Sequence, residues 1–346
     1  MKGLVFHEPG DLRVEQLPAP ALPERGLLMR VRYAGICGTD VRIFTGKKAV
    51  VGPRVIGHEF VGEIVASAHP DWADRVGARV AVYPVVTCGE CYACQRGRKN
   101  ICVRRRTFGY EIDGGFAEQV AVPAEAVDGG NVTVLPDSLS DEDAVLSEPA
   151  TAVLHGIRRA QIGAGETVVI SGGGPIGLLH AAVARLAGAG RVILAEPQAE
   201  RRELARQRGV DTVLDPTAGP LAEQLAGLTD GAGVDVAIIA AGVPALVGEL
   251  LGALNKGARC VVFAGMPPGS TSVIDANLVH YREIDVIGSS GSTPETQRDV
   301  LELISTGKLR VRDLISDLYP LDNWRAAFGQ DGTVPAMKAV FSMGLN

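Results

Sequence analysis

Four cysteines lie close together in the sequence with the spacing of metal ligands. Cys88, Cys91, Cys94 and Cys102 follow the pattern C-x2-C-x2-C-x7-C within fifteen residues. Four thiolates can surround one tetrahedral zinc ion and leave no position for water or substrate. A disulfide pair or an iron–sulfur cluster would use the same residue type, although no flanking Cys-Pro run suggests a ferredoxin. The pattern predicts a structural zinc that stabilises its loop and does no chemistry itself.

A second group of metal-ligand types is spread over three separate segments. Cys37 stands in G-I-C-G-T-D, His58 and Glu59 stand in G-H-E, and Glu148 stands in S-E-P. Each residue alone has an ordinary reading, as a packed thiol, a satisfied imidazole or a surface charge. Together, a thiolate, an imidazole and carboxylates can hold zinc with three protein ligands and one open position. An open zinc site of this kind can catalyse a reaction.

A glycine-rich turn lies where a strand meets a helix. Its sequence G-G-G-P-I-G satisfies G-x-G-x-x-G through Gly172, Gly174 and Gly177, with Pro175 and Ile176 opening the predicted helix. Glycines let the backbone approach a pyrophosphate, and the helix N-terminus favours its negative charge. The turn therefore predicts a dinucleotide site.

An acidic residue strengthens that prediction. Glu196 ends the next predicted strand nineteen residues after Gly177, where a carboxylate can accept hydrogen bonds from the adenosine ribose. A carboxylate there repels a 2′-phosphate, which favours NAD over NADP. Arg201 and Arg202 are close enough in sequence to keep NADP as the alternative, and they can equally face water.

The elements that must position these residues fall into two patterns. The first 150 or so residues carry short β-type runs between Gly and Pro turns, at 27–33, 60–66, 79–85 and 117–122. From Thr167 onward, strands and helices alternate, which is typical of a parallel α/β sheet. The predicted strands are 168–171, 191–195, 212–214, 234–240, 259–264 and 286–289, and the predicted helices are 175–186, 199–207, 221–227, 245–254 and 294–304. A last strand at 339–342 is expected to return to the first domain.

Size and charge limit the classes of function. A chain of 346 residues is longer than a single hydrophobic core usually supports, so we expect about two domains. A net charge of −6 argues against affinity for nucleic acid or an anionic membrane. The sequence shows no secretory signal and no run of apolar residues long enough to span a membrane. Thiolate zinc ligands suit a reducing compartment, so we expect a cytoplasmic protein.

Taken together and in this order, the motifs resemble those of zinc-dependent medium-chain alcohol dehydrogenases, in the polyol (sorbitol) and threonine dehydrogenase branch. The resemblance covers nearly the whole chain and includes G-G-F-A-E at 114–118. It implies an α/β fold with a mostly-β GroES-like catalytic domain at 1–148 and 286–346, in which 88–102 form the structural zinc lobe. A Rossmann domain with a doubly wound parallel sheet, at 149–285, would bind NAD.

The resemblance also assigns roles. It implies a catalytic zinc held by Cys37 and His58, with either Glu59 or Glu148 as the carboxylate ligand at rest. Thr39 would pass the hydroxyl proton outward, and Asp40 would orient His58.

One position departs from the pattern. Many relatives have a histidine five residues after the first ligand, at the outer end of a proton relay, whereas this chain has Arg42. Arginine cannot accept a proton at working pH, so the relay must end elsewhere.

The implied function is NAD-dependent oxidation of a secondary alcohol on a small polyol, sugar or cyclitol. L-Threonine 3-dehydrogenase and aminocyclitol (2-deoxy-scyllo-inosamine-type) dehydrogenase activities are the alternatives, and a nucleic-acid-binding zinc ribbon with an NAD sensor is a rival from another class. Phe44, Phe108 and Tyr110 are candidate pocket walls or ordinary packing. The resemblance further implies a homodimer or homotetramer that pairs through residues 285–289.

Overall fold

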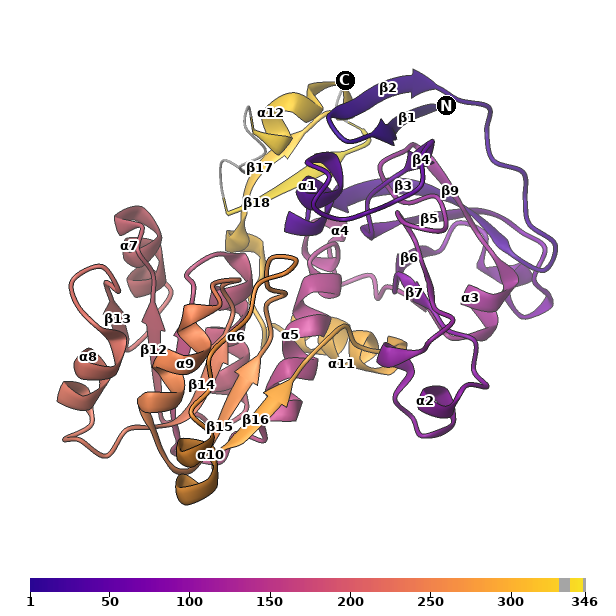
Figure 1. The fold of residues 1–346 in the computed structure, drawn as a ribbon. Coiled ribbons are helices and arrows are strands. Elements are labelled where there is room, and N and C mark those ends of the chain that lie inside the picture. The colour runs from indigo at the N-terminus through magenta and orange to yellow at the C-terminus, as the bar shows by residue number, and fades with distance from the viewer. Residues whose placement is uncertain (330–336, 345–346) are drawn as a thin grey trace. The chain divides into compact units, whose positions relative to one another are not determined.

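The computed structural model describes residues 1–329 and 337–344 of the chain (Figure 1). The chain divides into two compact units, Met1–Thr151 with Ser292–Asn346, and Ala152–Gly291. The sequence placed the second boundary at 285/286, but strand β16 (Asp285–Gly288) pairs with β15 (Leu254–Val262) of the second unit. Residues 286–291 therefore belong with the second unit rather than the first.

The first unit is mostly β, as the short runs predicted. Its further strands are β1 (Lys2–Glu8), β2 (Asp11–Gln16), β3 (Leu27–Gly35), β4 (Arg54–Val55), β5 (Glu59–Ser67), β6 (Arg79–Val82), β7 (Val85–Val86), β8 (Arg106–Thr107), β9 (Gln119–Val122), β10 (Val132–Val134), β17 (Ile315–Tyr319) and β18 (Lys338–Ser342). Its helices are α1 (Gly38–Phe44), α2 (Tyr92–Gln95), α3 (Ala124–Asp128), α4 (Asp141–Ala144), α11 (Pro294–Ser305) and α12 (Trp324–Phe328), and α5 (Ser147–Ala160) leads out of it. Short 3-10 helices occupy Pro70–Arg75, Lys99–Ile101, Arg312–Leu314 and Leu321–Asn323.

Strand β3 is the centre of the main sheet of this unit. Its side chains alternate between buried and more exposed positions over most of its length, as expected for a strand with one face on the core. It pairs antiparallel with β5 on one side and with β18 on the other, so the C-terminal strand returns to the first unit as predicted. Packed aromatic rings fill the core beneath it, and Phe116 lies 4.9 Å from Phe341 between ring centroids.

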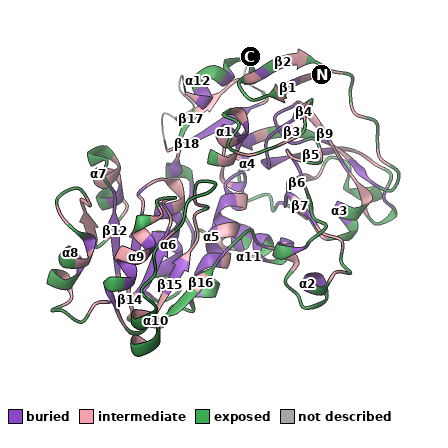
Figure 2. Cartoon of the chain, in the orientation of Figure 1, coloured by how far each residue is buried: buried purple, intermediate pink, exposed green. Residues whose placement is uncertain are grey.

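The second unit is a parallel sheet with the order β13-β12-β11-β14-β15-β16. Its other strands are β11 (Thr167–Ser171), β12 (Arg191–Ala195), β13 (Thr212–Leu214) and β14 (Val234–Ile239), and its helices are α6 (Pro175–Leu186), α7 (Ala199–Gln207), α8 (Leu221–Leu228), α9 (Ala245–Gly252) and α10 (Ala276–Arg282). Strands β11, β12 and β14 are buried over almost their whole length (Figure 2). The strand order reverses beside β11, the point at which doubly wound sheets bind ligands.

One departure from the predicted elements is at β15. The sequence placed a helix to 254 and a strand only from 259, whereas β15 begins at Leu254, which pairs with Val234. Exposed Lys256 and Gly257 interrupt the apolar run, so the sequence pattern does not indicate the first part of the strand. Within the described ranges, no helix has both the length and the apolar character needed to cross a membrane.

His180 is a fully buried histidine in α6. Neither ring nitrogen has a hydrogen-bond partner among the described residues, and the ring packs edge-on against Phe263 at 4.5 Å. Burial disfavours the charged imidazolium and lowers the pKa of His180 from 6.5 to about 3. The second unit therefore buries a neutral histidine beside its glycine turn.

This histidine makes the folded state sensitive to acid. In the unfolded chain the His180 imidazole binds a proton below pH 6.5, whereas the buried imidazole binds one only near pH 3. The contribution of His180 to the free energy of unfolding is therefore complete above pH 6.5 and falls as the pH decreases. Between pH 7.5 and pH 5 we expect a loss of about 2 kcal/mol, which His180→Leu should remove. Denaturant unfolding at both pH values measures this loss, with His280→Leu, at an exposed position, as control. An equal loss in wild type and His180→Leu would contradict the interpretation.

Candidate functional site

Two paired strands of the first unit, β3 and β5, bring predicted catalytic residues together. Cys37 lies at the N-terminus of α1, immediately after β3, and Glu59 is the first residue of β5. The antiparallel register pairs Gly35 with Glu59, which places the G-I-C segment beside the G-H-E segment. Sheet pairing therefore connects two motifs that are separated in sequence.

One ligand atom from each of Cys37, His58 and Glu59 lies within 4.8 Å of the others. Asp40 supports two of these residues: its Oδ2 accepts a hydrogen bond of 2.8 Å from the backbone N–H of Cys37, and its Oδ1 lies 3.3 Å from Nδ1 of His58. Since Asp40 faces Nδ1, Nε2 is the ring nitrogen left to bind a metal. Burial alone would lower the pKa of His58, but electrostatic interactions with Tyr110, Asp40 and Cys37 raise that pKa well above 6.5.

The donor set fits zinc. A thiolate, an imidazole and a carboxylate are the ligand types that zinc prefers, and three of them leave a position open. Oε1 of Glu59 is fully buried and has no hydrogen-bond partner among the described residues. A buried carboxylate oxygen without a donor is costly unless a cation binds it. The unpartnered oxygen is therefore available to a metal ion, and the three residues together could hold one.

Lys338 completes the cluster and was missed by the sequence analysis. The buried side chain enters from β18, donates a hydrogen bond of 2.9 Å to the backbone oxygen of Ile36, and forms an ion pair with Oε2 of Glu59. Glycine at position 35 permits this approach, because a Cβ there would collide with Oε2 of Glu59. Burial opposes the charge of Lys338, but Glu59 and Cys37 raise its pKa above 10.5. The available signal was a lone lysine at the head of an otherwise apolar strand.

Glu148 and Thr39 lie around the cluster rather than in it. Glu148 stands in the first turn of α5 and is not among the residues that meet within 4.8 Å. Burial and the neighbouring charge of Glu59 raise its pKa to about 7 against the opposing effect of His58. Oγ1 of Thr39 lies 3.6 Å from Sγ of Cys37. The structure thus distinguishes the two candidate carboxylates by position.

The three aromatic candidates for pocket walls have different surroundings. Phe44 packs edge-on against Trp324 at 5.7 Å, and Phe108 packs against Phe60 at 5.6 Å. Only Tyr110 of the three contacts the cluster, with its ring 5.4 Å from that of His58. Phe108 is therefore a core residue, Phe44 is a partly buried residue packed against the core, and Tyr110 stays the candidate for a pocket wall.

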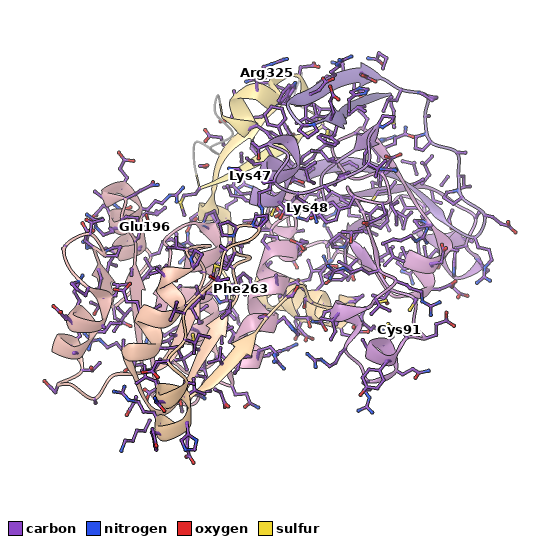
Figure 3. The ribbon with its side chains drawn as sticks, in the orientation of Figure 1. Lys47, Lys48, Cys91, Glu196, Phe263 and Arg325 are labelled. Atoms are coloured by element: carbon purple, nitrogen blue, oxygen red, sulfur yellow. The ribbon has the colours of Figure 1, made fainter. Side chains whose placement is uncertain are left out.

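The four cysteines of the lobe gather as their spacing predicted. Sγ of Cys91 lies 3.5 Å from that of Cys94 and 3.8 Å from that of Cys102, and Cys102 and Cys88 are 3.4 Å apart (Cys91 is labelled in Figure 3). A tetrahedral zinc with bonds of ~2.3 Å separates its sulfur ligands by about 3.8 Å. All four cysteines are free thiols, so the structure shows no disulfide here. The geometry fits zinc.

In the second unit, the glycine turn has the features that a pyrophosphate requires. Gly172 has φ of +106°, Gly174 caps α6, and Pro175 is the first helical residue. A Cβ at Gly177 would collide with the backbone oxygen of Gly172, so only glycine allows this tight turn. Ile176 follows in the first turn of α6, so these residues meet as predicted.

Glu196 is attached to the same turn. Its Oε2 accepts a hydrogen bond of 2.6 Å from the backbone N–H of Gly173, and its Oε1 accepts one of 2.9 Å from Gln198. Arg202 is held by Asp215 at 2.8 Å, whereas Arg201 extends toward Gly174. Arg202 also donates a hydrogen bond of 2.9 Å to the backbone oxygen of Glu196, so Arg201, which forms no ion pair with the described residues, is the arginine that extends toward the turn.

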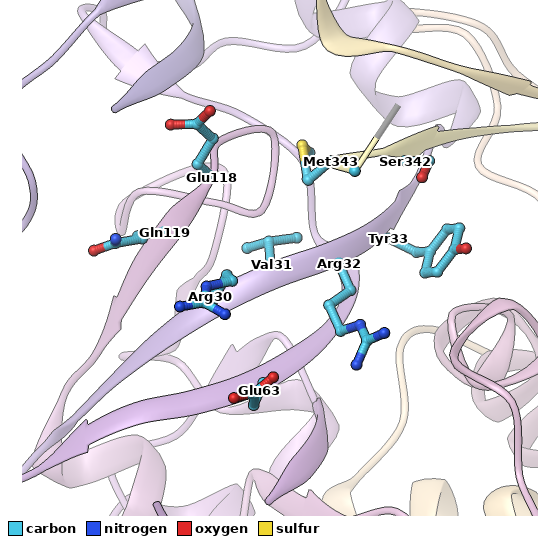
Figure 4. A pocket seen from close by; sticks show the side chains of 10 residues that line it. Arg30, Val31, Arg32, Tyr33, Glu63, Glu118, Gln119, Ser342 and Met343 are labelled. Carbon is cyan, nitrogen blue, oxygen red and sulfur yellow. The ribbon is translucent and has the colours of Figure 1, made fainter. Parts of the chain in front are cut away.

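A surface cavity elsewhere on the first unit lies apart from this chemistry. It has a volume of about 530 Å³ and lies over β3, β5 and β9, with side chains of both charges, such as Arg30 and Glu118, around it (Figure 4). None of the clustered metal-ligand residues lines it.

Comparisons with known proteins agree with the fold. The family described as zinc-binding dehydrogenase matches residues 175–306, and the alcohol dehydrogenase GroES-like domain matches residues 23–129. The chain is 32% identical to sorbitol dehydrogenase of Bacillus subtilis (strain 168), over 94% of this chain and 92% of that protein. It is 35% identical to L-threonine 3-dehydrogenase of Pyrococcus abyssi, over 90% and 89%.

A solved structure is similar over the whole fold. It is a protein of Sinorhizobium meliloti 1021 described as a zinc-binding dehydrogenase and bound to NADP, with a TM-score of 0.92, 34% identity, and coverage of 99% of this chain and 98% of that chain. A GroES-like unit together with a Rossmann unit defines an oxidoreductase of alcohols. The chain belongs to the zinc-dependent medium-chain alcohol dehydrogenases, in the polyol and threonine dehydrogenase branch.

The position of Glu59 leads to a test of the two carboxylates. We expect Glu59→Gln to lower the zinc content from two atoms per chain to one, and Glu148→Gln, its matched control, to retain two. Glu59→Gln also leaves Lys338 buried without a counter-charge, at a cost of about 3 kcal/mol or more. The double variant Glu59→Gln/Lys338→Met should recover stability but not zinc. Loss of zinc from Glu148→Gln instead would contradict the assignment.

Proposed function

We propose that this protein oxidises a secondary alcohol on a polyol, sugar or cyclitol, with NAD as hydride acceptor, and also catalyses the reverse reduction. The observation that supports this proposal most strongly is the buried cluster of Cys37, His58 and Glu59 with an unpartnered carboxylate oxygen. When bound there, zinc would supply Lewis acidity that makes an alcohol hydroxyl easier to deprotonate.

The protein side chains have distinct roles in this proposal. Cys37, His58 and Glu59 hold the catalytic metal, and Asp40 fixes the imidazole and makes it a better ligand. Lys338 balances the charge of Glu59, so that the site keeps a thiolate and a carboxylate without excess negative charge. Thr39, beside Cys37, receives the substrate proton, and its route ends at a group other than Arg42.

The proposed coenzyme is NAD. Glu196 is a buried carboxylate fixed at the glycine turn, and a 2′-phosphate there would meet its negative charge. Arg201 supports NADP as the second coenzyme because its guanidinium extends toward the same turn. Cys88, Cys91, Cys94 and Cys102 would hold the structural zinc.

L-Threonine is the second candidate substrate, since the relative from Pyrococcus abyssi is named for it. Recognition of its ammonium group would need a carboxylate that is free of other partners. Glu59 is paired with Lys338, which leaves Glu148 as the acidic group near the cluster.

We also propose a homodimer or homotetramer in the cytoplasm. Strand β16 is the edge of the parallel sheet and is largely exposed, with Val286 at 40% exposure. An exposed edge strand can pair with its copy across a twofold axis. The six free thiols support a reducing compartment.

Substitution of Cys37 tests the proposed activity. Cys37→Ser should reduce kcat/KM at least about a thousandfold, since metal catalysis supplies several kcal/mol. The zinc content should fall by one atom per chain, while the variant should still fold and show a cooperative thermal transition. The zinc of the lobe serves as internal control. The substrate is found by following NADH fluorescence across polyols, cyclitols, amino alcohols and threonine. Undiminished turnover by Cys37→Ser would contradict the proposal.

Coenzyme choice has its own test. Glu196→Ala should lower the ratio of kcat/KM for NAD to that for NADP by about tenfold or more, because it removes both the ribose acceptor and the repulsive charge. Arg202→Ala, at the neighbouring arginine held by Asp215, is the comparison variant. If the ratio of kcat/KM for NAD to that for NADP is the same in Glu196→Ala and wild type, Glu196 does not bind the adenosine ribose.

A further inference from the structure

Lys48 lies close to the cluster and has no assigned role. It follows α1 in the exposed segment T-G-K-K, next to Lys47 (both labelled in Figure 3), and is itself half-buried. Its Nζ lies 4.2 Å from the ring centroid of Tyr110, and that ring lies 5.4 Å from the ring of His58. The Lys48 ammonium and a proposed metal ligand therefore lie close to the same aromatic ring.

The charge of Lys48 is not balanced by a carboxylate. No acidic side chain of the described residues forms an ion pair with its Nζ, and burial lowers its pKa. Glu111 is the acid that acts on it most, but Oε2 of Glu111 accepts a hydrogen bond of 2.8 Å from the backbone N–H of Thr107. Arg42 and Arg105 add further positive charge around it. The surroundings thus favour an additional anion.

The tyrosine ring does not replace that anion. A cation over an aromatic face gains about 0.5 to 2 kcal/mol, less than a charge-assisted hydrogen bond to a carboxylate can supply. The ring does hold the ammonium at Tyr110, whose ring is also 5.4 Å from that of His58, so a molecule bound near His58 can extend to it. A half-buried ammonium placed in this way is suited to receive a negative group of the substrate.

Resting on the proposed alcohol oxidation, we propose that Lys48 binds a carboxylate at the end of the substrate, so that the substrate is a sugar acid of the aldonate class. An aldonate carries hydroxyl-bearing carbons between its carboxylate and the hydroxyl that reacts, and therefore extends from the metal site past Tyr110 to Lys48. A single ammonium matches one negative charge, whereas a phosphate dianion is better matched by several donors or an arginine fork. A cationic aminocyclitol would be repelled by Lys48, Arg42 and Arg105.

The test compares Lys48→Met with Lys47→Met in the zinc-loaded full-length enzyme. The probes are hexonates of the gluco, galacto and ido series, the neutral hexitols of the same series, and the hexitol 6-phosphates. We expect wild type to prefer a hexonate. The ratio of kcat/KM for hexonate to that for hexitol should fall about 10- to 100-fold in Lys48→Met. In Lys47→Met, at the exposed neighbouring position, the ratio should stay within a factor of two of wild type.

Three results would overturn the assignment. These are a wild-type preference for hexitols or hexitol phosphates, an equal fall of kcat/KM for both classes in Lys48→Met, and a raised KM for the coenzyme with no change in the substrate ratio.

Calorimetric titration of hexonates into the zinc-loaded protein separates this inference from the proposed function. Hexonate affinity that drops at least tenfold in Lys48→Met, without turnover, supports the carboxylate site while the proposed oxidation fails. Turnover of hexitols with no hexonate binding supports the oxidation and removes the carboxylate site.

Discussion

The buried ion pair between Glu59 and Lys338 is the constraint on which the metal site depends. It forms only when β5 and β18 both pair with β3, so the C-terminal strand must return before the charge of Glu59 is balanced. A buried ion pair is a weak source of stability, because the cost of removing two charges from water can exceed their attraction. A buried carboxylate that has one oxygen on lysine and the other without a donor is better explained by metal binding than by stability.

The same arrangement explains the glycine at position 35 and the buried aspartate at position 40. Gly35 has no side chain because Oε2 of Glu59 occupies that space, and the backbone N–H of Cys37 is fixed by Asp40. Asp40 is fully buried and faces both Cys37 and His58, so one carboxylate orients two proposed ligands. The proposed metal site is thus held by a network of buried charged side chains that pair with or orient one another. Specificity is left to side chains one layer farther out, such as Tyr110 and Lys48.

The sequence predicted those parts of the molecule that are encoded locally. The four-cysteine spacing, the glycine turn and the apolar strands of the second unit each lie within a short segment, and helix α6 begins and ends where predicted. A lone lysine at the head of β18 is visible in the sequence, but its partner is not, because only the pairing of β18 with β3 places Lys338 beside Glu59. Nor could the sequence separate Tyr110 from Phe44 and Phe108, because what each aromatic ring contacts depends on the folded structure.

We propose that this fold carries two zinc sites of different kinds, one closed by four thiolates and one formed by Cys37, His58 and Glu59. The most direct test is metal analysis of purified, active enzyme, combined with a crystal structure that locates zinc by its anomalous scattering. The account predicts two zinc atoms per chain, with one bound by Cys37, His58 and Glu59. An active enzyme that holds zinc in the cysteine lobe alone would contradict it.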